Sequence, residues 1–229
     1  MSKYGTLYGV GTGPGDPELI TLKAARVLRA CDLIAIPTKN RKDCFAYRIA
    51  YAAFPEIETK PILEIDMPMT RDMEKRELAY EAGAAALCEA LEAGKDVAFL
   101  TLGDPTVYST FCYLHERVRA RGFRSEIIPG VTSFCAAAAA LSMPLCEDRE
   151  ELHIIPSHGN YKETVDYRGT KIYMKGDLSN LIAALSKSSL SACAVENCGT
   201  DSERQYRSLE DIPADAGYYT VIIAKEKKP

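Results

Sequence analysis

The sequence of 229 residues contains no tryptophan, only three histidines and no excess of positive charge. The three histidines have no spacing that suggests a metal site or a catalytic pair. The formal net charge of −4 provides no global field that would attract nucleic acid. No segment approaches the roughly 20 apolar residues of a membrane-spanning helix, and the first residues lack a signal peptide's apolar run. We therefore expect a cytoplasmic protein that binds neither nucleic acid nor membrane.

Cys-x-x-Cys pairs are also absent, although the chain has eight cysteines. Only Cys193 and Cys198 lie close together, and no histidine follows them at the spacing of a zinc finger. Free cysteine is among the most often buried residue types. We expect reduced, mostly buried thiols and no bound metal ion.

Strand and helix patterns alternate in the first half of the chain. Apolar β-prone runs separate segments with apolar residues at steps of three and four, which predicts a mostly parallel sheet with helices on both faces. The second half is less regular and predicts a mixed sheet, so the expected fold is two α/β domains, residues 1–128 and 129–229. The predicted strands are 6–10, 33–36, 97–102, 125–128, 153–155, 171–174, 192–196 and 218–224, and the predicted helices are 18–29, 44–53, 73–93, 108–121, 131–141 and 178–185.

A glycine-rich segment, GVGTGPGDP at 9–17, follows the first predicted strand and precedes a helix. Glycine at every second position permits unusual backbone angles and lets a ligand approach the main chain. The spacing is not G-x-G-x-x-G and the segment has no P-loop lysine, which disfavours a dinucleotide or a nucleoside triphosphate. A tight strand-to-helix turn without a ligand remains the alternative.

Two further polar turns follow predicted strands, LTLGDPTVYS at 100–109 and PGVTSFC at 129–135. Ligands of open α/β sheets bind beyond the carboxyl ends of the strands, so these turns can face one crevice. Asp104 can accept hydrogen bonds from a ligand ammonium or ribose hydroxyl, or it can cap the helix expected near Thr106. Thr132 and Ser133 can likewise hold a ligand or cap the following helix.

A basic run at 39–42, KNRK, is followed by further arginines. Such a run is usually a solvated face, but arginine also pairs with carboxylates through two parallel hydrogen bonds. The candidate carboxylate-binding residues are Lys39, Arg41, Arg48 and Arg71.

The three ligand-type segments together resemble the motifs of the tetrapyrrole (corrin/porphyrin) methylase family. The resemblance rests on residues 7–24, 101–105 and 128–133, in the family's order and over nearly the whole chain. Two further stretches, PMTRD at 68–72 and residues 102–115 with 130–136, are similar to the branch that methylates carbon 20 of precorrin-2 or cobalt-factor II.

This resemblance implies a homodimer of two-domain subunits with S-adenosylmethionine bound in a cleft between the domains and S-adenosylhomocysteine as product. The loop at 197–200 matches the family only loosely, and Thr12 stands where valine is common in this branch. Carried onto this sequence, the donor-binding residues are Pro14, Leu102, Gly103, Asp104, Val107, Thr132, Ser133, Met174, Gly199 and Thr220.

The implied reaction moves a methyl group from the sulfonium to meso carbon 20 of precorrin-2 or cobalt-factor II (cobalt-sirohydrochlorin). The methyl group is already electrophilic, so the protein's contribution is proximity, alignment and exclusion of water. A base must then remove a proton from the substituted carbon, and Asp104 is the candidate. The substrate carries eight carboxylates, which the basic residues Lys39, Arg41, Arg48 and Arg71 would meet.

Alternatives remain at this stage. A related methylase can act on another tetrapyrrole carbon, or on a protein or RNA, although the acidic balance weighs against RNA. A nicotinamide-dependent oxidoreductase would need the G-x-G-x-x-G spacing with an acidic residue about 20 positions on. Asp32 lies near that distance, but the glycine spacing is wrong. A non-catalytic binding module has no need for several ligand-facing loops.

Overall fold

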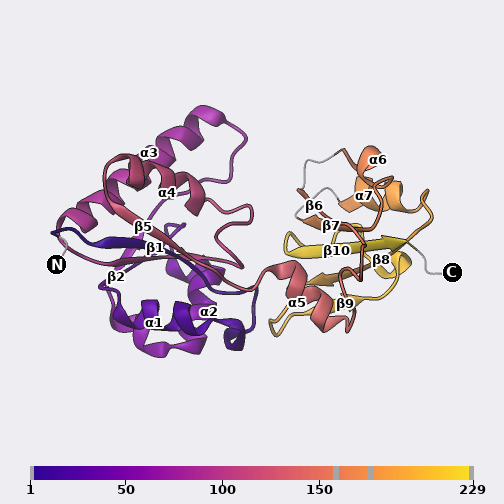
Figure 1. The fold of residues 1–229 in the computed structure, drawn as a ribbon, viewed down its shortest axis with the longest axis horizontal. Helices are drawn as coiled ribbons and strands as arrows, with labels where there is room; N and C mark the ends of the chain where they lie inside the picture. The colour runs from indigo at the N-terminus through magenta and orange to yellow at the C-terminus, as the bar shows by residue number, and fades with distance from the viewer. Residues whose placement is uncertain (1–2, 157–159, 175–177, 227–229) are drawn as a thin grey trace. The chain divides into compact units, whose positions relative to one another are not determined.

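The computed structural model describes residues 3–156, 160–174 and 178–226. The chain divides into two compact units, Met1–Thr132 and Ser133–Pro229. Each unit contains one five-stranded sheet (Figure 1). The domain junction expected near Pro129 lies in the loop that precedes this boundary.

The first sheet has the strand order β3-β2-β4-β1-β5 and is parallel throughout, as predicted. In the central pairs, Gly11 lies beside Thr101 and Val10 beside Ile128, so the carboxyl ends of β1, β4 and β5 meet at one edge. The strands are β1 (Thr6–Gly11), β2 (Leu33–Ile36), β3 (Ile62–Glu64), β4 (Val97–Thr101) and β5 (Arg124–Ile128).

Helices cover both faces of this sheet (Figure 1). Leu28 of α1 and Ala50 of α2 pack with Val10, Ile34 and Leu100 on one face. The other face carries α3 and α4, whose apolar residues pack against alternate residues of the same strands. Because both faces are covered, the strands read as continuous apolar runs. The helices are α1 (Leu22–Ala30), α2 (Phe45–Ala53), α3 (Met73–Glu92) and α4 (Phe111–Ala120), with 3-10 turns at Pro17–Leu19, Arg41–Asp43 and Pro55–Thr59.

Two predicted helix starts in this unit were wrong. The helix expected over 18–29 is a 3-10 turn followed by α1, because Thr21 is extended and its hydroxyl caps α1 by accepting from the Ala24 amide at 3.1 Å. The helix expected from Tyr108 begins at Phe111. Tyr108 has a φ of +47°, in the left-handed region, which a right-handed helix cannot include.

The second sheet has the order β6-β7-β10-β8-β9 and is mixed, as predicted. Among the described strands, only β6 and β7 pair in parallel, whereas β10 pairs antiparallel with β7 and β8, and β8 pairs antiparallel with β9. The strands are β6 (Leu152–Pro156), β7 (Thr170–Met174), β8 (Leu190–Glu196), β9 (Arg204–Tyr206) and β10 (Thr220–Glu226).

The described part of the second unit contains three α-helices. Residues of α6 (Tyr161–Thr164) and α7 (Leu178–Leu185) pack against Tyr173, Ala194 and Ile222 on one face of the sheet. The small-residue helix α5 (Ser133–Ala140) lies against β10 and β8. A 3-10 turn, Leu209–Asp211, follows β9.

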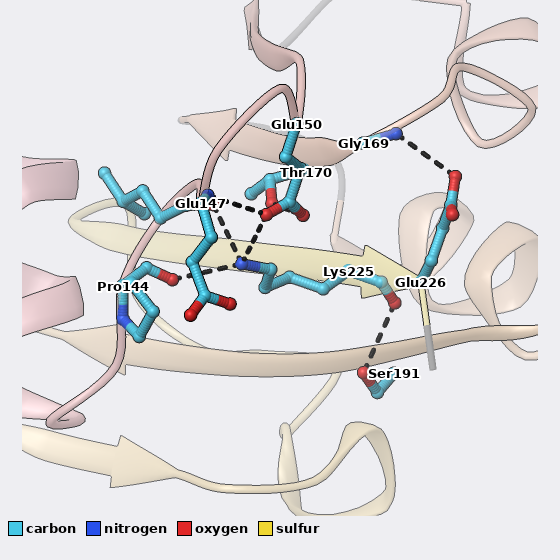
Figure 2. A network of polar contacts seen from close by, with 9 residues as sticks. Pro144, Glu147, Glu150, Gly169, Thr170, Ser191, Lys225 and Glu226 are labelled. Carbon is cyan, nitrogen blue, oxygen red and sulfur yellow. Dashed lines mark hydrogen bonds and ion pairs between the residues drawn. The ribbon is translucent and has the colours of Figure 1, made fainter. Parts of the chain in front are cut away.

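A polar network ties the segment after α5 to this sheet (Figure 2). The Lys225 ammonium donates to the carbonyl oxygens of Pro144 and Leu145, at 3.1 and 3.0 Å, and to the Glu150 carboxylate at 3.1 Å. Glu150 also accepts from the Thr170 hydroxyl at 2.8 Å. These bonds, with the Lys225 charge, hold the pKa of Glu150 below its ordinary value although partial burial opposes them.

Lys171 of β7 is fully buried, and its amine has no hydrogen-bond partner in the part of the chain that the structure describes. An unpaired buried amine costs about 1–3 kcal/mol. We expect Lys171→Met, which keeps the side-chain length, to raise the free energy of unfolding by roughly this amount. Urea unfolding at pH 7 measures it, and Lys187→Met at an exposed position should change stability by less than about 0.5 kcal/mol.

The gain should shrink at alkaline pH. Burial lowers the pKa of Lys171, although Glu226, Asp166 and Glu150 oppose the shift. Between this lowered pKa and about 10.4, the value in the unfolded chain, the unfolded state binds more protons than the folded state. The native protein therefore becomes more stable relative to Lys171→Met as pH rises through that window. A gain that grows with pH would contradict this assignment.

None of the described helices is both long and apolar enough to cross a membrane. All eight cysteines are free thiols. Four are buried, Cys31, Cys44, Cys88 and Cys198, while two are half-buried and two exposed, so burial is less complete than the sequence suggested.

Candidate functional site

The loops that follow β1 and β4 are joined by a short backbone bridge. The Gly13 amide donates to the Gly103 carbonyl at 3.3 Å, and the Gly103 amide donates to the Gly13 carbonyl at 2.9 Å. Both glycines have positive φ, +75° and +72°, which residues with a Cβ rarely adopt. The Thr12 amide adds a bond to the Thr101 carbonyl at 2.9 Å. The glycines therefore serve to join the two turns at the carboxyl edge of the sheet.

The loop after β5 joins the same cluster through glycine-to-glycine packing. A Cβ at Gly130 would lie 2.2 Å from the Gly103 carbonyl oxygen and 2.9 Å from the Gly11 Cα. A Cβ at Gly11 would lie 2.6 Å from the Gly130 nitrogen. Only glycine allows three main chains to approach this closely. The structure thus brings together the three segments that sequence analysis selected.

Asp104 links two of these loops. One carboxylate oxygen, Oδ1, accepts from the Thr106 amide at 2.7 Å and from the Thr106 hydroxyl. The other, Oδ2, accepts from the Gly130 amide at 2.9 Å. The side chain is buried, so these charge-assisted bonds are stronger than exposed ones. A carboxylate has about four acceptor positions, which leaves capacity for one further donor.

Two hydroxyl groups at this edge have no hydrogen-bond partner in the described part of the chain. Thr101 Oγ1 and Thr132 Oγ1 are buried, and neither makes a hydrogen bond within the described residues. Buried hydroxyls are nearly always satisfied, so each marks a position where a bound polar group would be stabilised. Thr132 was expected from sequence, whereas Thr101 was missed. The sequence feature that could have identified Thr101 is its position as the last residue of an otherwise apolar strand, directly before the LGDP turn.

A thiol supports the loop after β4. Cys112 of α4 donates from Sγ to the Pro105 carbonyl at 3.1 Å. Burial raises the pKa of this thiol, and the carboxylates of Glu116 and Asp104 raise it further. The thiol therefore stays protonated and keeps donating at neutral pH, which holds the turn in place.

The same loops of this unit carry three further predicted residues, Pro14, Leu102 and Val107. Pro14 is buried directly after Gly13, and Leu102 and Val107 are half-buried on either side of Asp104. Ser133, half-buried, is the first residue of α5 and opens the second unit. The Thr21 hydroxyl, which caps α1, also donates to the Pro129 carbonyl at 3.4 Å and so connects this helix to the third loop.

In the second unit, Met174, Gly199 and Thr220 gather at one end of the sheet. Met174 ends β7 and pairs with Val221, the neighbour of Thr220, and both Met174 and Thr220 are buried. Gly199 lies just beyond β8, with a φ of +77° and its amide donating to the Glu203 carboxylate at 2.7 Å. This bond and one from Gln205 help to lower the pKa of Glu203.

The basic residues differ in how free their charges are. Lys39 pairs with Asp66 at 2.8 Å and Arg41 pairs with Glu58 at 3.9 Å. Arg48 lies over the Phe45 ring, 4.0 Å from its centroid. Arg71 is exposed and makes no ion pair with any described residue.

The arrangement at the carboxyl edge of the first sheet suits a small polar ligand held by main-chain groups, two free hydroxyls and one carboxylate. Ligands of open α/β sheets bind at this edge. No group of three or more histidine, cysteine, aspartate or glutamate side chains that could hold a metal ion occurs in residues 3–156, 160–174 and 178–226.

Comparison with known proteins matches residues 6–213 to the family model for tetrapyrrole (corrin/porphyrin) methylases. The chain is 32% identical over 232 residues to the cobalt-precorrin-2 C(20)-methyltransferase of Salmonella typhimurium, covering 97% of each protein. It is 40% identical over 170 residues to a Methanocaldococcus jannaschii protein named probable cobalt-precorrin-2 C(20)-methyltransferase, covering 74% of this chain and 71% of that protein.

The fold is also that of solved structures. The uroporphyrin-III C-methyltransferase of Thermus thermophilus, in complex with S-adenosylhomocysteine, superposes with a TM-score of 0.71. The match covers 97% of this chain and 98% of that one, at 21% sequence identity.

Proposed function

Because the chain belongs to the tetrapyrrole (corrin/porphyrin) methylase family, we propose that it transfers a methyl group from S-adenosylmethionine to carbon 20 of a precorrin-2-type ring in cobalamin biosynthesis. The observation that carries this proposal is the 32% identity to the Salmonella typhimurium C(20)-methyltransferase, which extends over 97% of both chains. The names of these two relatives favour the cobalt-loaded ring, cobalt-precorrin-2, over metal-free precorrin-2.

The loops of the first unit fit the methyl donor. The free hydroxyls of Thr101 and Thr132 suit its ribose and amino-acid polar groups, and the remaining acceptor position of Asp104 suits its ammonium or a ribose hydroxyl. We propose that the loops of the first unit bind the donor through Pro14, Leu102, Gly103, Asp104, Val107 and Thr132. For Ser133, Met174, Gly199 and Thr220 of the second unit, donor binding is the role that the family resemblance implies.

When bound, the donor supplies a methyl group on a sulfonium that is already a strong electrophile. The protein therefore needs no covalent nucleophile, and its residues work by alignment. The paired backbone bonds between Gly13 and Gly103 and the glycine contact at Gly130 make the loops rigid before a ligand arrives. Preorganised positioning of this kind can lower a barrier by about 7–11 kcal/mol.

Asp104 acts in this scheme as a donor-binding and positioning residue. Its two oxygens already accept three hydrogen bonds, and the proposed contact to the methyl donor takes the remaining acceptor position, so no lone pair is left to accept a proton. The role of base, for which the sequence suggested Asp104, is thereby less favoured than the binding role.

Basic residues near the carboxyl edge would meet the ring carboxylates. We expect the double variant Arg48→Gln with Arg71→Gln to raise the KM for the ring by roughly tenfold, since each lost charge pair costs up to about 1 kcal/mol at an exposed site. The salt dependence of KM should fall at the same time because fewer charges are screened. Steady-state kinetics at two salt concentrations measures both changes.

Arg124→Gln is the matched control, since Arg124 begins β5 at the opposite edge of the sheet. Its KM should equal that of the native enzyme. Unchanged kinetics in the Arg48 and Arg71 double variant would remove these two residues from the substrate site.

The direct test of the function combines binding and product analysis. Calorimetry should detect micromolar S-adenosylhomocysteine binding and no NADH binding. Cobalt-loaded and metal-free rings incubated with S-adenosylmethionine should be compared by mass spectrometry for a gain of one methyl group, with NMR locating it at carbon 20. Methylation of another carbon would place the chain in a different branch of the family. NADH binding without methyl transfer would contradict the proposal altogether.

We further propose that the enzyme acts as a homodimer, as the family resemblance implies, and that it works in the cytoplasm. Light scattering after gel filtration tests the dimer. A mass near 25.2 kDa, that of one chain, would contradict it.

A further inference from the structure

The second unit contains a cavity of about 220 Å³ that includes none of the residues assigned to the donor. The lining residues are mostly apolar, and two of them, Met143 and Cys193, contain sulfur. Cys193 Sγ lies 3.4 Å from Met143 Sδ and 3.6 Å from the Ile223 carbonyl oxygen. The lining is formed by Leu141, Met143, Ser191, Ala192, Cys193, Arg207, Ile223 and Lys225.

The cavity lies away from the end of the sheet that carries Thr220. In the β10–β8 ladder, Thr220 faces Glu196 whereas Ile223 faces Cys193, three positions further on. At about 3.3 Å per residue this separates the two sites by roughly 10 Å along the sheet. The segment just after α5, with Leu141 and Met143, closes the cavity on another side.

Of the two cations that line the cavity, Lys225 already has an anionic partner, Glu150. Its ammonium is held by Glu150 and by the carbonyls of Pro144 and Leu145, so its donors are in use (Figure 2). Its role is to fix one wall.

Arg207, in contrast, makes no ion pair with the described residues. Its guanidinium has two long hydrogen bonds to neutral acceptors, 3.5 Å to the Leu141 carbonyl and 3.3 Å to the Gln205 side chain. A guanidinium has five N–H donors in a planar fork, so several remain for an anion.

The pKa of the Cys193 thiol agrees with a positive charge on Arg207 that reaches the cavity. Burial raises the pKa of the Cys193 thiol, and the positive charges of Arg207 and Lys225 oppose that rise. Both charges therefore act on the interior of the cavity and not only on the solvent.

We propose that this cavity binds a small monocarboxylate with an apolar body, whose carboxylate pairs with Arg207 while its body packs against Met143, Cys193 and Ile223. An apolar cavity of about 150 Å³ already accommodates benzene, so this cavity has room for a six-membered ring and a carboxylate. A bidentate guanidinium–carboxylate pair supplies orientation, and the apolar walls supply contact area. The proposal does not depend on the methyltransferase activity.

The test uses benzoate as probe and benzamide as its neutral counterpart of the same shape. The full-length protein carries ¹³C-labelled methyl groups on methionine and isoleucine, and titration is followed by NMR. Benzoate should shift the Met143 and Ile223 methyl signals saturably and bind at least about tenfold more tightly than benzamide, as expected for a charge-assisted bond.

Two arginine variants distinguish loss of the Arg207 charge from a general effect on the folded protein. Arg207→Gln should reduce the preference for benzoate to within about twofold, because the amide cannot form the ion pair. Arg204→Gln, an exposed arginine on the adjoining strand β9, should retain it. The proposal is overturned if neither probe binds, if the two probes bind equally to the native protein, if the preference survives Arg207→Gln, or if the Met143 and Ile223 signals do not move.

Discussion

Gly130→Ala is expected to weaken S-adenosylhomocysteine binding by about 10- to 100-fold, because overpacking of this kind costs about 1–3 kcal/mol. The new Cβ would lie 2.2 Å from the Gly103 carbonyl oxygen and 2.9 Å from the Gly11 Cα, and both neighbours are main-chain atoms. They can yield only by separating the loops that form the candidate donor site. Isothermal titration calorimetry measures the affinity, and circular dichroism checks that the protein remains folded.

Gly122→Ala is the matched control. Gly122 has a φ of +87°, so alanine there is also strained, but no atom lies within 4 Å of the added Cβ. The control should lose about 1 kcal/mol of stability and keep its affinity for S-adenosylhomocysteine. Equal losses of affinity in the two variants would attribute the effect to stability and not to the contact between the loops.

Asp104→Asn is expected to raise the Kd for S-adenosylhomocysteine by about 10- to 100-fold, since a buried donor left without its acceptor costs about 1–3 kcal/mol. An asparagine has one acceptor oxygen, whereas Asp104 accepts from Thr106 with one oxygen and from the Gly130 amide with the other. In either orientation of the asparagine amide, its NH₂ group would face the N–H donor of Thr106 or of Gly130 where an acceptor is needed. Calorimetry and the pH profile of kcat are measured together.

The pH profile distinguishes the two roles of Asp104. A positioning residue leaves the shape of the profile unchanged and moves mainly the donor affinity. A general base removed by the substitution would lower kcat, abolish the acidic limb of the profile and leave the affinity near its native value. Asp16→Asn is the control, because Asp16 also accepts an amide bond, from Glu18 at 2.8 Å, and asparagine caps equally well.

Much of the first unit was predictable because its strands are covered on both faces. The run at Leu33–Ile36 is apolar throughout and the run at Val97–Thr101 is apolar up to its last residue, which a half-exposed strand would not be. The short strand Ile62–Glu64 was missed, since three residues at the edge of a sheet carry too little periodicity to identify. The start of α4 was predicted too early because Tyr108 has a positive φ, which cannot be predicted from sequence for a residue other than glycine.

The candidate site shows the same division. Gly13, Gly103 and Asp104 were identifiable because their residue types favour turns and they follow two predicted strands, 6–10 and 97–102. The sequence could not show that the hydroxyls of Thr101 and Thr132 lack a hydrogen-bond partner among the described residues. Whether a buried group is satisfied depends on every atom around it. The same holds for the charge of Arg207, which is free only because no acidic side chain among the described residues lies within reach.

Burial pattern and turn chemistry are local properties, so the two-sheet α/β architecture, the order of the main elements and the three turn segments could be predicted from the sequence. Only the folded chain reveals that Gly11, Gly103 and Gly130 touch, that Asp104 bonds across two loops, and that the buried Lys171 amine has no hydrogen-bond partner among the described residues. These facts depend on distances between residues far apart in the chain, which are set by packing and not by neighbouring residues.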